Sequence, residues 1–436
     1  MTKLRGKLYP LAPWAAGVLI GLMGTPAGAM DLKNADGSWT FSISGNVNVH
    51  YIYSKCESSP SAIVVVAGAC TGNQSGSNVS NVGNGLLPAA FSFGVSTTQN
   101  GIDLSAHLGL YPGIATNDGG SPNLQQTTGN GSSNFALGTT GLDVRQVYMT
   151  FGNKDMGTFT FGRNFGLFGF DAIIADMTLP GVGVAGSASG PAPSNTTLGS
   201  IGFGYIYVDT LAQMNYTTPD FSGLNFTIGI FDPLNSVTNA DTVAPKKAPG
   251  FHGKVAWTVP VSNTTKFYAS ATFISQKQNY ICSSPVCAAS LGAGTAYSYD
   301  GTGFDVFAKI DVAGFEAFAY YYHGSGLGTT GFFIFSDDGR GNKRDSNGYL
   351  VQATYKVGDV KFGANYGVSK LDFANAVDQA ALPTLVDKSR KVTGGVYYSL
   401  TKNLTLLGEV SDVHADAHNG NSNHSTNANV GAFLAF

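Results

Sequence analysis

The residues of this chain best suited to chemistry include four cysteines. Cys56 and Cys70 lie in one segment rich in Gly, Ser and Asn, and Cys282 and Cys287 lie in another. No histidine stands at metal-ligand spacing beside either pair, and Cys-x4-Cys is not the spacing of a thioredoxin-like redox motif. We therefore predict two local disulfides, Cys56–Cys70 and Cys282–Cys287, of the kind that an oxidising compartment favours.

A second group that could do chemistry lies near the C-terminus. His414, His418 and His424 are close to Asp412 and Asp416, and imidazole with carboxylate is a common ligand set for zinc. The histidine spacings of four and six residues are not those of a rigid site. We interpret these residues as part of a solvated polar loop, and we predict no metal and no cofactor.

Catalytic motifs are absent from the sequence. It contains no Gly-x-Ser-x-Gly, His-Glu-x-x-His, P-loop or haem-attachment motif. We predict that the protein is not an enzyme.

The remaining charged residues fall within segments that alternate between apolar and polar side chains. From Trp39 to Tyr53 this period of two would place the apolar residues on one face of a strand, whereas a helix would scatter them around its surface. The same pattern returns in later segments and predicts sixteen strands in all. The later segments are 87–98, 102–112, 142–153, 156–164, 201–217, 223–231, 251–260, 265–277, 301–313, 314–323, 347–358, 359–371, 390–401, 403–414 and 425–436.

The connections between these strands alternate between short and long. The expected long ones are 54–86, 113–141, 165–200, 232–250, 278–300, 324–346, 372–389 and 415–424. Brief turns at one end and long loops at the other are typical of outer-membrane β-barrels. A soluble β-sandwich is the alternative for any alternating sequence, but it rarely needs this many strands with two lengths of connection.

Composition favours the barrel. Charged residues are only 12% of the chain, about half of the roughly 25% usual in soluble domains, and the net charge of −3 argues against a nucleic-acid partner. No run of 18 apolar residues follows residue 30, so a membrane-embedded chain must satisfy its backbone groups in a closed sheet. The predicted fold is all-β, a 16-stranded antiparallel transmembrane barrel.

The N-terminus has the pattern of a secretory signal. Basic residues within the first seven positions precede a mostly apolar run, 8–22, and then Ala27-Gly28-Ala29. We expect a signal peptide at 1–29 and a mature barrel at 30–436. The protein is then predicted to lie in the cell outer membrane, among its lipids and lipopolysaccharide.

The C-terminus is an alternating strand that stops on Phe436, whereas a soluble domain more often ends in a frayed polar tail. This ending resembles the terminal signal read by the outer-membrane barrel-assembly machinery. We expect that machinery to be a partner during biogenesis.

The segment 145–183 resembles the trimeric general-diffusion porins of Gram-negative bacteria. Residues 155–166 match their fifth strand and its exit into loop three, while Asp171 and 176–183 look like the part of loop three that folds into the barrel. The resemblance implies an outer-membrane porin, a water-filled channel for passive diffusion of small hydrophilic solutes and ions. It also implies loop three inside the lumen and a homotrimer.

In that family, acids on loop three face a ladder of basic residues across the lumen. The resemblance implies that the pore constriction contains Arg145, Asp143, Arg163, Asp171 and Asp176, with a structural role at the loop exit as the alternative for Arg163. The chain keeps only part of this arrangement. Ladder positions on the first two strands are occupied by Asn46 and Ala90, and the acid after the loop-three Leu-Pro is replaced by Gly181-Val182.

The alternation also assigns other charges to the lumen. A lysine facing lipid near mid-membrane costs about 2–4 kcal/mol, whereas one facing water costs little. The residues expected to face the lumen are Asp103, His107, Lys254, Asp305, Lys309, Glu316, Lys361, Lys391 and Glu409. One strand is less regular: Val147, Met149 and Phe151 fall on the face expected for Arg145, which is consistent with a subunit contact.

Two other functions stay open. A channel specific for one solute class would need rails of aromatic and charged residues, which Phe318, Tyr320 and Tyr322 could supply. A barrel enzyme such as an outer-membrane lipase, or an adhesin, is the third class. A lipase would need a Ser/His pair on its lipid face, and the loops have no repeats that indicate adhesion.

Overall fold

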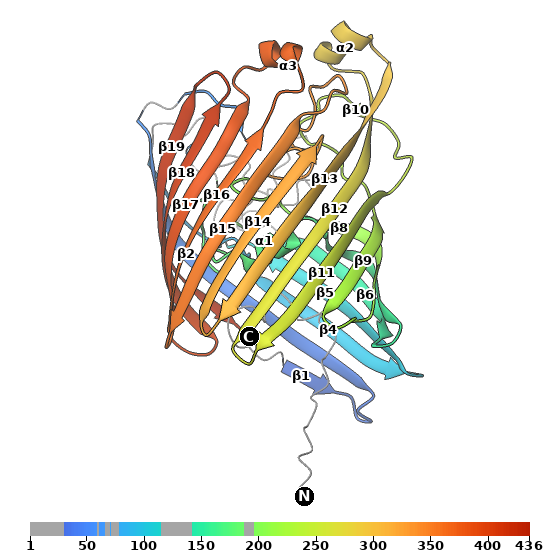
Figure 1. The fold of residues 1–436 in the computed structure, drawn as a ribbon, viewed down its shortest axis with the longest axis vertical. Helices are drawn as coiled ribbons and strands as arrows, with labels where there is room; N and C mark the ends of the chain where they lie inside the picture. The colour runs from blue at the N-terminus through green and yellow to red at the C-terminus, as the bar shows by residue number, and fades with distance from the viewer. Residues whose placement is uncertain (1–29, 59–60, 66–69, 71–77, 115–141, 187–195) are drawn as a thin grey trace, which may run out of the picture.

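The computed structural model describes residues 30–58, 61–65, 70, 78–114, 142–186 and 196–436. In this part of the chain, sixteen antiparallel strands form a closed barrel (Figure 1). Its wall consists of β2 (Trp39–Cys56), β4 (Ala90–Gln99), β5 (Ile102–Pro112), β6 (Leu142–Asn153), β7 (Gly157–Phe165), β8 (Thr210–Thr217), β9 (Leu224–Phe231), β11 (Gly250–Ser262), β12 (Thr265–Ile281), β13 (Ala296–Val312), β14 (Phe315–Ser325), β15 (Asp345–Val357), β16 (Val360–Leu371), β17 (Val386–Ser399), β18 (Leu404–Ala417) and β19 (Ser422–Ala435).

Several short elements accompany the wall. Three strands of two to five residues extend its ladders: β1 (Met30–Lys33), β3 (Val79–Gly83) and β10 (Thr242–Val243). The helices are α1 (Phe170–Ala175), α2 (Pro285–Leu291) and α3 (Ala376–Ala381). No helix in the described ranges is both long and apolar enough to cross a membrane.

The period of two in the sequence becomes the two faces of the wall. On β15, Tyr349, Val351 and Tyr355 are 38–51% exposed, whereas the intervening Leu350 and Gln352 are at most 5% exposed. Successive side chains of a strand point to opposite faces. The apolar row therefore forms the outer surface and the intervening row faces the interior.

The first and last wall strands close the barrel. β19 pairs with β2 from Ser425↔Cys56 to Ala435↔Asn46, and Phe436 exchanges two backbone hydrogen bonds with Gly45, at 2.7 and 3.0 Å. A Cβ atom on Gly45 would lie 2.9 Å from the Phe436 ring. The terminal aromatic residue thus lies against the seam.

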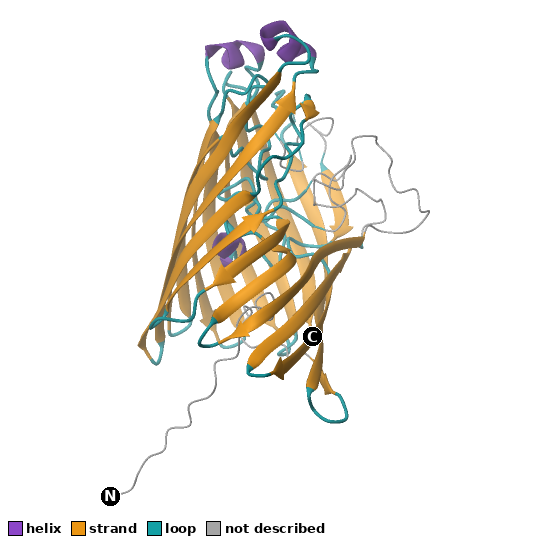
Figure 2. Cartoon of the chain, turned by 90° about the vertical axis from the view of Figure 1, so that its right-hand side faces the viewer, coloured by secondary structure: helices purple, strands orange, loops and turns teal. Residues whose placement is uncertain are grey.

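The barrel is taller on one side than on the other. β7, β8 and β9 have nine, eight and eight residues, whereas β12 and β13 have 17 each, and Figures 1 and 2 show the resulting slanted rim. Both expected disulfides, Cys56–Cys70 and Cys282–Cys287, are present.

The predicted fold class is confirmed, and most strand bounds agree with the structure within four residues. Two starts differ by more: β13 begins at Ala296, five residues before the predicted 301, and β8 begins only at Thr210 within the segment predicted as a strand at 201–217. Ile201, Phe203 and Tyr205 are each at most 7% exposed. Their apolar spacing reflects packing inside the barrel and not an outward lipid-facing row.

Candidate functional site

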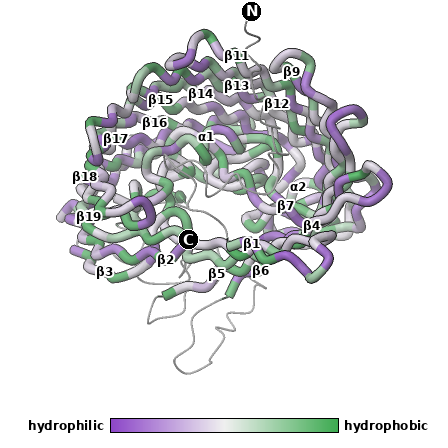
Figure 3. Tube along the Cα trace, turned by 90° about the horizontal axis from the view of Figure 1, so that it is seen from below, coloured by the Kyte–Doolittle hydropathy of each residue, from purple (hydrophilic) through white to green (hydrophobic). Residues whose placement is uncertain are grey.

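The connection between β7 and β8 lies inside the barrel. We call it the crossing loop (166–209); its residues 187–195 lie outside the described ranges. The view along the barrel in Figure 3 shows its helix α1 within the ring of strands. Phe168, Ile206 and Val208 are completely buried in one apolar cluster with inner-wall residues such as Phe307 and Tyr322.

The helical part of the crossing loop is attached to β11, β12 and β13. Asp171 forms an ion pair of 2.7 Å with Lys254 and accepts hydrogen bonds from Tyr268 Oη, at 3.1 Å, and from Ser270 Oγ. The side chains of Asp171 and Lys254 are only 14% and 12% exposed. The loop acid and the wall base therefore meet directly, with no gap between them.

The backbone just before α1 is held by a second acid of the wall. Asp305 on β13 accepts a hydrogen bond of 2.6 Å from the Gly169 N–H. Gly169 has φ +76°, and a Cβ there would lie 2.7 Å from the Ile206 carbonyl oxygen. Only glycine fits this turn without strain.

The middle of the crossing loop is fixed by polar groups of β15 and β16. The Met177 N–H donates to Gln352 Oε1 at 2.7 Å. Asp176 accepts hydrogen bonds from Tyr205 Oη at 3.0 Å and from Asn365 Nδ2 at 3.1 Å, and its residue is 2% exposed. Asp176 thus acts as a buried hydrogen-bond acceptor within the loop packing.

The tip of the crossing loop meets Glu409 of β18. The carboxylate Oε2 accepts from the backbone N–H groups of Val182 and Gly183, at 2.8 and 2.9 Å, while Oε1 accepts from Tyr397 Oη at 2.7 Å. A Cβ on Gly181 would lie 2.0 Å from Oε1. The crossing loop has no acid at Gly181, and the Glu409 carboxylate of the wall lies at that position instead.

The opposite side of the tip contacts the segment before β4. Backbone N–H groups of Leu86 and Leu87 donate to the carbonyls of Gly181 and Leu179, at 2.7 and 3.0 Å. Asn48 on β2 donates through Nδ2 to the Leu87 carbonyl at 2.8 Å. The tip is therefore held at the β18–β19–β2 side of the barrel, across the closed strand order from β11 and β12, where Asp171 is bonded.

The two uncharged ladder positions lie next to this contact. Asn46 and Ala90 are 2% and 7% exposed, and Asn46 Oδ1 accepts from Asn48 Nδ2 at 2.8 Å. Asn46 therefore bonds to the same Asn48 that holds Leu87, and neither ladder position faces open water.

Arg145 and Asp143 form a pair on the inner side of β6. Their Nε–Oδ2 distance is 3.2 Å, both residues are at most 5% exposed, and the guanidinium lies 5.1 Å from the centre of the Tyr111 ring. The β5–β6 register shifts between Gly109 and Leu110.

That shift is a β-bulge, and it corrects the expected faces of β6. Arg145 and Gln146 are both 5% exposed, whereas Val147 and Met149 are 49% and 50% exposed. A bulge places two residues opposite one and re-aims the strand. The prediction that Val147, Met149 and Phe151 share the face of Arg145 is therefore wrong.

Arg163 does not lie in the row that faces the lumen. Its register partners are Val147 on β6 and Ala212 on β8, and both are exposed on the outer face. The inward row of β7 contains Thr160 and Asn164. By register Arg163 is thus outside the inward row, but its charge acts on Tyr207 and the buried Asp209 of the crossing loop, and its role at the constriction stays a prediction.

The other charges predicted to face the lumen belong to inward rows, but each has a partner. Lys309 is 2.7 Å from Glu316 and 3.5 Å from Asp311, near the short β13–β14 turn. The Lys361 ammonium lies 4.8 Å from the centre of the Tyr397 ring.

Lys391 on β17 and His107 on β5 also belong to inward rows. Lys391 is 1% exposed and donates to Thr393 Oγ1 at 3.2 Å. The His107 ring stacks on Tyr148 at 4.9 Å. Neither side chain is free in an open lumen.

The aromatic residues considered as a solute rail are covered. Phe318, Tyr320 and Tyr322 are 5%, 3% and 0% exposed, and Phe168 of the crossing loop lies 6.3 Å from Tyr322, ring centre to ring centre. They form the apolar support beneath the loop.

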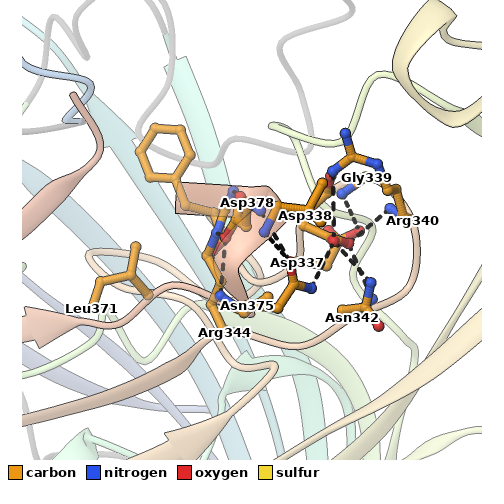
Figure 4. A network of polar contacts seen from close by, with 12 residues as sticks. Asp337, Asp338, Gly339, Arg340, Asn342, Arg344, Leu371, Asn375 and Asp378 are labelled. Carbon is orange, nitrogen blue, oxygen red and sulfur yellow. Dashed lines mark hydrogen bonds and ion pairs between the residues drawn. The ribbon is translucent and has the colours of Figure 1, made fainter. Parts of the chain in front are cut away.

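A second polar network joins loops at the tall rim. We call it the outer network; it consists of Asp337, Asp338, Arg344, Asn375 and Asp378 (Figure 4). Arg344 Nε and Nη2 donate to the two carboxylate oxygens of Asp378, at 2.7 and 2.6 Å, and both residues are at most 4% exposed. This bidentate pair connects the loop after β14 to α3.

Two acids of the outer network, Asp337 and Asp378, have pKa values shifted in opposite directions. Burial raises the pKa of Asp337 to about 6, although hydrogen bonds from Asn239 and Gly339 oppose the shift. Burial also raises the pKa of Asp378, but the hydrogen bonds from Arg344 and Ala374 outweigh it, and the net pKa is lowered. Asp337 is therefore the group of this pair that titrates nearer to neutral pH.

Sequence reasoning named Asp171, Lys254 and Glu409 but did not join them to their partners. It missed Gln352 and Asn365, whose only signal was inward parity on their strands. The contacts of Leu86 and Leu87 with the crossing loop had no signal in the sequence, because they use backbone groups.

Comparison with known proteins agrees with this architecture. The family model described as Gram-negative porin matches residues 16–418, and no curated protein sequence matches the chain. Among solved structures, the outer membrane channel DcaP of Acinetobacter baumannii has a TM-score of 0.62 at 14% identity, covering 93% of this chain and 99% of that one.

Two further structures share the fold. Salmonella typhi OmpF in complex with daunomycin has a TM-score of 0.54 at 14% identity, covering 93% of this chain and 100% of that one. Pseudomonas putida OprB has a TM-score of 0.54 at 10% identity, with 91% and 94% covered. Because the family model matches most of the sequence, the chain belongs to the Gram-negative porin family.

Proposed function

We propose that this protein forms a water-filled channel for passive diffusion of small hydrophilic solutes and ions across the outer membrane, with weak ion selectivity. The observation that carries the proposal is the crossing loop, which runs through the lumen of a closed barrel and is bonded to β11 through Asp171 and, across the closed strand order, to β18 through its tip. Such a loop narrows an opening that sixteen strands would otherwise leave wide.

The arrangement of charge supports weak selectivity. A strong field across a pore needs acids and bases separated by water, because a pair in contact cancels at longer range. Here Asp171 is 2.7 Å from Lys254, and Arg145 is 3.2 Å from Asp143. Backbone amides bind Glu409 without removing its negative charge, and the buried Lys391 is the wall base that acts on both Glu409 and Asp176.

A channel specific for one solute class is the alternative. It would need aromatic side chains in contact with the aqueous path, and Phe318, Tyr320 and Tyr322 are buried beneath the crossing loop. This burial favours general diffusion.

Planar-bilayer recording tests the proposal. We expect stepwise openings with a linear current–voltage relation, and a reversal potential close to zero under a tenfold KCl gradient. Conductance that saturates, or that one class of sugar, peptide or carboxylate blocks, would replace general diffusion with a specific channel.

We further propose a homotrimer that uses the outer face of the short strands. Phe151, Phe159 and Tyr216 form a row there, with ring centres 4.9 and 4.8 Å apart, and Val147 and Met149 beside it are about half exposed. Chemical cross-linking in detergent should give a three-subunit species. Cleavage of a signal peptide after Ala29 is checked by N-terminal sequencing of the protein from membranes.

A further inference from the structure

Three potential metal ligands meet on the outer face of the barrel at the loop ends of β18 and β19. His414 and His424 are direct cross-strand partners, and Asp412 is two residues before His414 on the same face of β18. Their side chains are 29%, 41% and 42% exposed, respectively. Ions from the medium therefore have access to them.

The donor atoms converge. His414 Nε2 lies 2.8 Å from Asp412 Oδ1, and His424 Nε2 lies 2.7 Å from Asp412 Oδ2. One donor atom from each residue lies within 4.8 Å of the others, and the two imidazole rings stack at 4.2 Å with an angle of 20°. Each ring thus presents the same nitrogen to one carboxylate.

We propose that Asp412, His414 and His424 bind one divalent late transition-metal cation, with Zn²⁺ and Cu²⁺ as the fitting ions. Two imidazole nitrogens and one carboxylate oxygen form a ligand set that such ions prefer, whereas Mg²⁺ and Ca²⁺ prefer oxygen alone. Zinc–nitrogen and zinc–oxygen bonds are about 2.0–2.2 Å, so small side-chain rotations bring all three donors to one ion. Water completes the coordination.

Charged residues of both signs lie beside the three ligands. Glu57 on the neighbouring chain segment donates its backbone N–H to the His424 carbonyl at 3.0 Å, and its carboxylate Oε2 has no hydrogen-bond partner among the described residues. Arg390, the register partner of His414, directs its guanidinium to Asp416 at 3.3 Å. The guanidinium of Arg390 thus pairs with Asp416, which it shares with Lys388 at 3.9 Å.

The site also has a rigid base. β18 and β19 pair without a register shift from Leu404↔Leu434 to Asp416↔Ser422. Ligands on regular strands are held more closely than ligands on loops. His418 is not part of the site, because its Nε2 bonds to the Leu371 carbonyl at 2.8 Å.

Calorimetric titration of the refolded, untagged full chain in detergent with ZnCl₂ tests the proposal. We expect one Zn²⁺ per chain, and we expect His414→Asn and His424→Asn each to weaken binding by roughly tenfold or more. The matched control is His323→Asn, because His323 is an outward, half-buried histidine at the loop end of β14; it should leave affinity unchanged.

Electron paramagnetic resonance of bound Cu²⁺ provides a second readout that does not depend on affinity. The wild-type spectrum should show superhyperfine splitting from two nitrogens, and each single variant should show one. The proposal is overturned if the double variant His414→Asn/His424→Asn, with native heat-modifiable migration on a gel, binds Zn²⁺ as the wild type does. It is also overturned if Cu²⁺ shows no nitrogen coupling.

Discussion

The crossing loop and the outer network both bring loops over the lumen, but they are held in different ways. The crossing loop is attached to strands: its backbone N–H groups meet wall acids and amides such as Asp305, Gln352 and Glu409. The outer network joins loop to loop, through Arg344 and Asp378. The crossing loop is therefore fixed to strands, by backbone groups and by the Asp171–Lys254 pair, whereas the outer network depends on a charge pair between two loops.

This difference has a physical consequence. Hydrogen bonds from backbone amides to a carboxylate require only one charged side chain in each contact, and that side chain is fixed on a strand. A buried ion pair between loops requires two charges, and losing either leaves the other unpaired. The outer network should therefore be the more easily broken of the two regions.

The largest effect is expected for Asp378→Asn. This change leaves Arg344 buried without its charge partner, which costs about 3–5 kcal/mol. Hydrogen exchange of 326–344 and 372–385 should accelerate while exchange in the strands is unchanged. Asp300→Asn is the control, because the Lys277–Asp300 pair is half exposed; equal acceleration in both variants would contradict the comparison.

A somewhat smaller effect is expected for Asp171→Asn. The change leaves Lys254, 12% exposed, without its ion-pair partner, at a cost of about 3 kcal/mol to the attachment of α1. Single-channel conductance should become noisier, and the reversal potential should move toward anion selectivity. The double variant Asp171→Asn/Lys254→Met should restore the potential; if it does not, the ion pair is not the source.

Glu409→Gln should have a moderate effect. It keeps an acceptor at the tip but removes the charge from two backbone hydrogen bonds, a loss of about 2 kcal/mol. We expect the tip to move, measured as increased open-channel noise without loss of the folded barrel. Glu316→Gln, at a pair near the short turns with 31% exposure, should leave the noise unchanged.

The smallest effect is a pH dependence confined to the outer network. The folded pKa of Asp337 is about 6, above the usual value of about 3.9 for the unfolded chain, so the folded network binds the extra proton between these values. Its stability is thus fully present below pH 4 and decreases as pH rises through 6. The lowered pKa of Asp378 acts only below pH 4.

Hydrogen exchange measured at pH 4.5 and 7, corrected for intrinsic rates, checks this dependence. Loop 326–344 should be more protected at pH 4.5. Asp337→Asn should remove the difference, and a difference that persists in the variant would assign it to another group.

The fold was predictable because its signal is repeated in every strand. Alternation such as Tyr349, Val351 and Tyr355 against Leu350 and Gln352 needs no knowledge of distant contacts. Prediction from alternation failed in two places. At Ile201–Tyr205 the alternating residues pack inside the barrel, and on β6 a bulge at Arg145 shifts the faces of the strand.

The site was less predictable because its contacts cross the lumen. Sequence parity placed Glu409 on the inward row, but nothing in the sequence near 409 reveals the amides of Val182 and Gly183. Linear spacing also gave no sign that His414 and His424 face each other, because they meet only once β18 and β19 form a hairpin. Pairing across strands, not distance along the chain, decides which side chains meet.

The missing side chain at Gly181 has a consequence for how such channels can change. The Glu409 carboxylate occupies the volume that a Gly181 side chain would need, so only one of the two chain positions can carry a group there at a time. Moving a carboxylate from position 409 to position 181 would therefore need two substitutions together. A side chain at position 181 alone would collide with Glu409, and loss of the Glu409 side chain alone would leave a void.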